Sequence, residues 1–354
     1  MIKIITNLEE LQKFRDNWNF IYTNTFNSTP FQHFEYLYSS LININKADDN
    51  LYIIILWNNI YKQWFAVFPF IKTKKGILKF INVSHSDFCT PLIIPQFNNY
   101  NLYEEVAEFL SAQKDIKGLW LENVRPEDSS LSMFKPFFKY SVSYDMNYFS
   151  DISIYSTEND RDIIDAFRYV NSTKRKNLRK LMKSMEGIEF KLCNKSDNIP
   201  YPAYEINFLI KFMVEKGIRD EEYFSDSMLT FWKDLYENGV LSVALLGDGE
   251  NIKSCNLIFY NEKRNEYISW IMLYTDRAWN LNINLKIAEY IYHNGMGTIN
   301  FARGIYDYKL VNFHPDVKPL FCVKIAKTKW GHCKNIVSMA AHFSKPIIKT
   351  FLRR

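Results

Sequence analysis

The segment 297–309 places several polar side chains directly after a predicted strand. Ile299 and Phe301 alternate with polar neighbours, as in a short half-buried strand, and this pattern breaks at Arg303 and Gly304. Four residues that can donate a hydrogen bond, accept one or carry a charge follow the break: Tyr306, Asp307, Tyr308 and Lys309. Open α/β sheets bind ligands at the carboxyl ends of their strands, so this segment is a candidate site. The alternative is a solvated loop.

Two cations in this segment suit acyl or phosphoryl chemistry. Arg303 and Lys309 lie where the phosphate of a donor or acceptor needs a counter-charge. Lys309 would stabilise charge that grows in a transition state, and either Tyr308 or Tyr306 would donate a proton to a leaving group. These three residues are our catalytic candidates, and Tyr306 is a candidate for substrate binding. Because we expect Lys309 at the surface, its replacement by alanine should lower turnover and leave the melting temperature nearly unchanged.

A second candidate lies in the first half of the chain, in the loop that contains His85 and Asp87. An amine must lose its proton before it attacks a carbonyl, and Asp87 is our candidate base. A carboxylate is a useful base near neutral pH only when partial burial raises its pKa. The alternatives are a turn-forming or capping role for Asp87 and a structural loop role for His85.

A basic segment separates the two halves of the chain, at 160–185. Arg175, Arg179 and Lys183 recur every four residues, so they share one face of a predicted helix. Such a face holds a phosphate or a nucleic-acid backbone, and we name Arg175 and Arg179 as substrate-binding candidates. A solvated helix face is the alternative.

Composition limits the classes of protein that this chain can be. It has 354 residues, of which 47% are apolar and 17% aromatic, which predicts two domains and excludes global disorder. The net charge of +5 does not require nucleic acid, and the five cysteines lack the spacing of metal ligands, so we expect no metal. Signal-peptide and bilayer-spanning patterns are absent, as are nucleophile-elbow, phosphate-loop and HExxH motifs. We therefore expect a cytoplasmic protein. The basic C-terminal helix 331–354 would suit peripheral contact with the inner membrane, and the alternative is a plain terminal helix.

Apolar periodicity predicts the same order of elements twice: helix, helix, strand, turn, strand, strand, helix, strand. In the first half the strands fall at 51–57, up to 71, at 77–83 and at 118–124. In the second half they fall at 240–247, 252–260, 266–274 and 298–302. The repeat predicts two copies of one α/β domain, at 1–150 and 186–330, joined by the basic segment 151–185.

These features together resemble a double-GNAT acyltransferase, specifically the CelD/BcsL-like cellulose-biosynthesis acetyltransferase group, which is related to the Fem-type peptidoglycan aminoacyltransferases. The stretches that carry the resemblance are TPFQHFEYLYSSL, WFAVFPFI, SHSDFCTPLI, NSTKRKNLRKLMKSM and INFARGIYDYKLVNF. The resemblance implies an α/β (α+β) fold of two tandem GNAT-like domains, each a mixed, mostly antiparallel sheet flanked by helices. The chain departs from the family at Asn300, where the family has an aspartate, and at 276–284, which contains no glycine.

The resemblance also implies a donor site in the C-terminal copy, between strand 266–274 and helix 282–294. Backbone N–H groups of the strand would bind the donor carbonyl, and the helix N-terminus would bind the pyrophosphate of CoA. Trp270 is a substrate-binding candidate, and its alternative is core packing. The implied cofactor-binding residues are Tyr274, Arg277, Trp279, Asn280, Asn282 and Asn284.

The predicted function is N-acyl transfer from acetyl-CoA or another acyl-CoA to an amino group of a sugar or of a lipid-linked surface-polysaccharide or cell-envelope precursor. One alternative is a Fem-like aminoacyltransferase that takes its acyl group from aminoacyl-tRNA, in which case tRNA is a partner. The other is a catalytically silent GNAT-like binding module.

Overall fold

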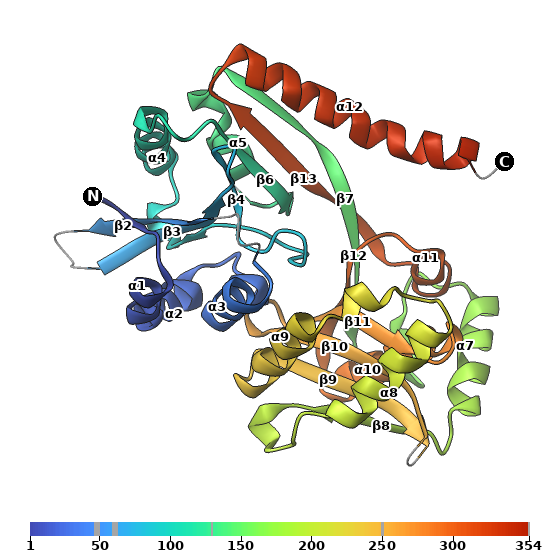
Figure 1. Ribbon diagram of the computed structural model, residues 1–354. Helices are drawn as coiled ribbons and strands as arrows, with labels where there is room; N and C mark the ends of the chain where they lie inside the picture. Colours follow the sequence, from blue (N-terminus) through green and yellow to red (C-terminus); the bar gives the residue numbers. More distant parts are fainter. Residues whose placement is uncertain (46–49, 59–62, 129, 249–250, 353–354) are drawn as a thin grey trace. The chain divides into compact units, whose positions relative to one another are not determined.

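The computed structural model describes residues 1–45, 50–58, 63–128, 130–248 and 251–352, without the side chains of 131, 132, 308 and 345–352. The chain forms two compact units. One unit consists of Met1–Asn147 together with Pro319–Arg354, and the other is Tyr148–Lys318. Each is an α/β unit built on a mixed sheet (Figure 1).

The first unit has the strand order β1-β2-β3-β4-β6-β13. Its strands are β1 (Ile2–Ile5), β2 (Asn50–Asn58), β3 (Gln63–Lys72), β4 (Ile77–Phe80), β6 (Gly118–Val124) and β13 (Asp316–Ala326), with the short β5 (Leu92–Ile93) beside β3. Neighbours are antiparallel except β4 and β6, which are parallel. The predicted hairpin β2–β3 is confirmed, and its turn lies outside the described residues.

Helices cover both faces of this sheet (Figure 1). They are α1 (Leu8–Lys13), α2 (Arg15–Asn24), α3 (Phe34–Asn43), α4 (Tyr100–Ala112), α5 (Ser130–Met133) and the C-terminal α12 (Lys329–Leu352). Helix α4 connects the parallel strands β4 and β6. Its apolar face, with Leu102, Val106 and Leu110, is buried in the core against Phe68 and Leu78.

The second unit has the strand order β7-β12-β11-β10-β9-β8. Its strands are β7 (Tyr140–Tyr155), β8 (Glu189–Cys193), β9 (Leu241–Asp248), β10 (Asn251–Asn261), β11 (Glu266–Tyr274) and β12 (Met296–Arg303). Its helices are α6 (Ile163–Ala166), α7 (Ser172–Ser184), α8 (Ala203–Glu215), α9 (Asp226–Glu237), α10 (Ala278–His293) and α11 (Asp307–Phe313). Here β11 and β12 are the parallel pair, and α10 connects them.

The two units therefore share one plan, in which three antiparallel strands are followed by a helix and a parallel strand. This confirms the predicted repeat of elements. Helix α10 fills the same position as α4, and its residues Ile283, Ile287 and Ile291 are buried in the core of the second unit.

The units exchange their last strands. Strand β7 follows the first copy, but its residues 149–155 pair with β12, and β13 follows the second copy but pairs with β6. The expected ranges 1–150 and 186–330 differ from the observed units for this reason. The segment 148–185 belongs to the second unit, and 319–354, including the helix expected as a separate element at 331–354, belongs to the first.

Candidate active site

The parallel strands β11 and β12 part after a short stretch of pairing. Their register runs from Glu266 opposite Thr298 to Ile268 opposite Asn300, although β11 continues to Tyr274. A β-bulge lies in β11, where Trp270 is an extra residue relative to β10. Backbone N–H and C=O groups of β11 beyond Ile268 have no pairing partner in β12, and the bulge adds a local bend to the same stretch of β11.

Strand β12 also bends where it leaves β11. Its register with β7 shifts between Asn300 and Arg303, and Ala302 has a φ of 56°, in the left-handed region. The Asn300 side chain holds this bend, because its Oδ1 accepts a hydrogen bond from the Ala302 N–H at 2.8 Å. Gly304 follows with a φ of 104° and turns the chain, as the sequence predicted.

The hydrogen bonds of Asn300 explain why an amide suits this position, where the resembled family has an aspartate. Its Nδ2 donates to Oε1 of Glu266 at 2.7 Å, and both side chains are buried. A carboxylate at position 300 would place two acceptors against each other in a site of low dielectric. The difference from the resembled family at position 300 is thus explained by Glu266, the hydrogen-bond acceptor on the neighbouring strand.

Lys309 lies in the interior, with 3% of its surface exposed, so the expectation of a surface position is wrong. Its Nζ donates to the carbonyl oxygens of Phe301 at 2.5 Å and Gly304 at 3.3 Å, and lies 4.9 Å from the ring centroid of Tyr306. Lys309 therefore joins α11 to the end of β12. Its catalytic role stays a prediction.

The other residues after β12 lie around the same turn. Arg303 is half-buried at the end of the strand, and Tyr306 is 53% exposed. The side chain of Tyr308 lies outside the described part of the chain. The roles predicted for these residues remain untested.

The N-terminus of α10 already binds a carboxylate. Oδ1 of Asp276 accepts from the Ala278 N–H at 2.8 Å, and the Asp276 carbonyl accepts from the Trp279 N–H at 3.0 Å. The next N–H, of Asn280, donates to the Arg277 carbonyl at 3.2 Å. A pyrophosphate was expected at the N–H groups of about 279–284. Asp276 binds the N–H that precedes them and adds a negative charge that repels an anion.

Buried amide side chains lie between α10 and the strands. Nδ2 of Asn256 donates to Ser269 Oγ at 2.7 Å, and Nδ2 of Asn284 donates to the Asn280 carbonyl at 2.7 Å and to Met272 Sδ at 3.4 Å. We call Asn256, Asn280 and Asn284 the amide cluster. Within the described chain, Oδ1 of each of the three has no hydrogen-bond partner. An unsatisfied buried acceptor costs about 1–3 kcal/mol, so the cluster suits a ligand with N–H or O–H donors.

The aromatic candidates of this region differ in how far they pack into the core. Trp270 packs against Phe231 and Phe259, with ring centroids 6.2 Å and 4.9 Å away, which fits the core-packing alternative. Trp279 packs on the edge of the core around α10. Tyr274 is half-buried at the end of β11, and Arg277 is exposed.

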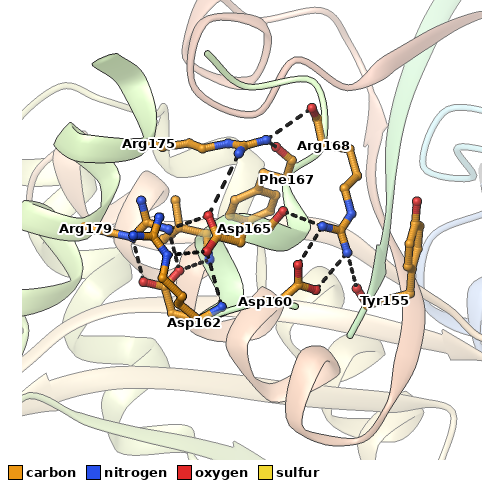
Figure 2. Close-up of polar contacts among 10 residues, drawn as sticks. Tyr155, Asp160, Asp162, Asp165, Phe167, Arg168, Arg175 and Arg179 are labelled. Atoms are coloured by element: carbon orange, nitrogen blue, oxygen red, sulfur yellow. Dashed lines mark hydrogen bonds and ion pairs between the residues drawn. The ribbon is translucent and has the colours of Figure 1, made fainter. Parts of the chain in front are cut away.

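Arg175 and Arg179 form intramolecular contacts with the loop before α7, as Figure 2 shows. Arg179 donates to Asp162 at 2.6 Å and 3.1 Å and to Asp165 at 2.5 Å, and Arg175 donates to the carbonyls of Phe167 and Arg168. Hydrogen bonds from Arg161 and Arg179 hold the pKa of the Asp165 carboxyl well below its usual range, although desolvation opposes them. Phosphate binding by these arginines stays a prediction and would compete with these contacts.

Asp87 lies in the first unit, in the loop between β4 and β5. It is 6% exposed, so it meets the condition of partial burial that a carboxylate base needs. His85 in the same loop is half-buried. The predicted role of Asp87 as a base remains a prediction.

Sequence reasoning missed Asp276, Asn256 and Glu266. A signal existed for Asp276, because an aspartate side chain typically accepts from a backbone N–H two residues on, in the turn that precedes a helix. Asn256 interrupts the apolar run of β10, which is a sign of a buried polar group. The partner of Glu266 lies 34 residues away in sequence, and no local pattern connects the two.

The site and the sheets define a class: the chain consists of two tandem GNAT-like units, and the predicted fold class is confirmed. Solved structures with the same fold include L-PGS from Bacillus licheniformis, which is 14% identical, with 92% of this chain and 93% of that chain covered and a TM-score of 0.58. FemX is 11% identical over 92% of this chain and 98% of its own, with a TM-score of 0.56.

A conserved protein of unknown function from Bacteroides thetaiotaomicron is also similar, at 11% identity, 92% and 100% coverage and a TM-score of 0.55. Similarity at these identities shows the fold alone. No protein-family model and no curated protein sequence matches the chain, so the resemblance to the CelD/BcsL-like group stays a prediction. Among the described helices, none is long and apolar enough to cross a membrane.

Proposed function

We propose that the protein is an acyltransferase that moves an acyl group onto an amine, with the donor carbonyl bound where β11 and β12 part. The observation that carries this proposal is the end of strand pairing at Ile268 and Asn300, next to the bulge at Trp270. Backbone N–H groups of β11 that face the gap in pairing are held rigidly by the sheet. Such preorganised donors stabilise the oxyanion that forms when an amine attacks a carbonyl.

For the donor, we favour an aminoacyl ester, as in aminoacyl-tRNA, over the acyl-CoA expected from the sequence. A CoA pyrophosphate needs free N–H groups at the start of α10, and Asp276 occupies that position. An aminoacyl group carries an ammonium, which needs acceptors. Oδ1 of Asn284 is a buried acceptor, because the bond from its Nδ2 to the Asn280 carbonyl fixes the orientation of the amide.

The experiment compares binding of acetyl-CoA, CoA and charged and uncharged total tRNA by the full-length protein. We expect charged tRNA to bind more tightly than uncharged tRNA, and CoA not to bind. Asn284→Leu should weaken binding of charged tRNA about tenfold or more. Asn294→Leu is the matched control, because Asn294 is exposed at the other end of α10 and its Nδ2 likewise donates to the carbonyl four residues before it.

Three outcomes separate the candidate functions. Binding of CoA without tRNA would return the donor to acyl-CoA, and Asp276→Ala should then strengthen that binding. Binding of neither donor would favour the silent module. Equal effects of the Asn294 and Asn284 substitutions, with unchanged melting temperatures, would remove the amide cluster from the donor site.

The acceptor remains, as proposed from the sequence, an amino group of a sugar or of a lipid-linked envelope precursor. Peripheral membrane contact through α12 is also a proposal. Trp330 is 71% exposed and Val337 67% exposed on this helix, which suits insertion into a lipid headgroup layer. Flotation with anionic and neutral vesicles, comparing wild type with Trp330→Ser, tests this contact.

A further inference from the structure

The first unit contains a cavity that none of the predicted site residues lines. Its volume is about 340 Å³, and it lies beside the end of α2, the segment around β5 and the first turn of α4. The walls include Phe26, Asn27, Thr90, Asn98, Tyr103 and Asp128. This volume falls in the range of small-molecule sites.

Asp128 is the charged group of this cavity. It is 6% exposed, and its Oδ1 accepts from the Ser130 N–H at 2.7 Å. Its Oδ2 is buried and has no hydrogen-bond partner in the described chain. Burial raises the pKa of the Asp128 carboxyl, against the opposing effect of Thr90 and Ser130. A buried carboxylate with one unsatisfied oxygen is costly unless something else pairs with it.

The protein supplies no counter-charge for Asp128 among its described residues. The nearest basic residue in sequence, Arg125, lies 3.8 Å from Glu127 and stacks on the Phe88 ring, 3.8 Å from the centroid. A ligand can supply the missing positive charge. The remaining walls combine aromatic surface, at Phe26 and Tyr103, with hydroxyl and amide groups.

We propose that this cavity binds a small primary amine with hydroxyl groups, such as an amino sugar, through an ion pair between its ammonium and Asp128. The ammonium pairs with the Asp128 carboxylate where that residue lines the cavity, and the ring of the ligand lies against the aromatic wall. Hydroxyl groups of the ligand reach Thr90 and Asn98. Binding is a property of this cavity alone, so it succeeds or fails independently of acyl transfer.

The test titrates the full-length protein, without any donor, with glucosamine by calorimetry. Glucose and N-acetylglucosamine are the uncharged controls. We expect both to bind at least tenfold more weakly than glucosamine. Asp128→Asn should weaken glucosamine binding at least tenfold, whereas Asp115→Asn, which changes an exposed aspartate of the same unit, should not.

A second measurement needs no variant and therefore does not depend on how well Asp128→Asn folds. Burial raises the pKa of the Asp128 carboxyl, so the affinity for an ammonium should fall as the pH is lowered and the carboxyl takes up a proton, which titrations at a series of decreasing pH values detect. Equal affinities for the three sugars, no binding of glucosamine, or an affinity for glucosamine that does not fall on acidification would each overturn the proposal.

Discussion

The bend at the end of β12 depends on a few buried polar side chains. Asn300 forms hydrogen bonds with Glu266 of the neighbouring strand and with the Ala302 N–H. Lys309 donates to the carbonyl oxygens of Phe301 and Gly304. Each group satisfies a backbone or side-chain partner that burial would otherwise leave unpaired. At the scale of the residue, the site is therefore shaped by hydrogen bonds that tolerate few substitutions.

Asn300→Asp should destabilise the protein by roughly 2–4 kcal/mol at pH 7, although it restores the aspartate of the resembled family. The new carboxylate faces Glu266 and cannot donate to it. One of the two carboxyls then has a raised pKa in the folded state, so the lost stability should return as the pH falls. Urea unfolding at pH 7 and pH 5 measures both effects. The double variant with Glu266→Gln should recover most of the loss, and equal stability of Asn300→Asp and wild type would contradict the contact.

Lys309→Met should lower stability by about 2–3 kcal/mol, because two buried carbonyl oxygens lose their donor. Thermal melts and urea unfolding measure the change, with Lys180→Met on the exposed side of α7 as the control. A melting temperature equal to that of wild type would mean that the ammonium is not structural. Lys309 would then return to the catalytic role predicted from the sequence.

At the scale of the element, helix termini determine what each helix can bind. Asp276 accepts from the N–H of Ala278, the first residue of α10, and His33 caps α3, where its Nδ1 accepts from the Glu35 N–H at 3.2 Å. Only a neutral imidazole can accept at Nδ1. Burial, with a smaller contribution from Arg15, lowers the pKa of His33 to about 4.

This cap predicts a pH dependence of stability. The pKa of His33 is 6.5 in the unfolded chain and about 4 in the folded protein. The contribution of the neutral His33 to the free energy of unfolding is therefore full above about pH 6.5 and is lost as the pH falls toward 4. The loss by pH 5 should be about 2 kcal/mol. Urea unfolding at pH 7.5 and pH 5 measures it. His33→Asn keeps a capping side chain and should remove this part of the difference; an unchanged difference would show that another group titrates.

At the scale of the whole molecule, the exchanged strands make each unit depend on the other half of the chain. Val323 and Ile325 of β13 are fully buried in the core of the first unit. Removal of β13 would take Val323 and Ile325 out of the core, expose the residues packed against them, and leave the backbone edge of β6 without a partner strand.

A fragment of residues 1–150 should therefore fail to unfold cooperatively on heating. The same fragment with residues 316–354 attached through a flexible linker should regain a cooperative transition. Circular dichroism during thermal melts distinguishes the two. Cooperative unfolding of the short fragment would show that β13 is dispensable.

Local patterns in the sequence were sufficient for the elements and their order. The alternation around Ile299 and Phe301, the helical spacing of apolar residues along α4 and α10, and the glycine turn at Gly304 all arise from neighbours within a few residues. Such patterns reflect backbone geometry and one-sided burial, which act over short stretches of chain. Their repetition predicted two copies of one α/β domain, whereas the GNAT-like sheet was implied by the family resemblance.

The tertiary structure decided which strands pair and which polar groups are buried. The pairing of β13 with β6 joins residues about 200 positions apart, and Glu266 meets Asn300 only because β11 and β12 are neighbours. Lys309, expected at the surface, is a buried donor because the bend at the end of β12 places the carbonyl oxygens of Phe301 and Gly304 next to its Nζ. Burial and sheet partners depend on contacts between distant segments, and a local pattern contains no information about them.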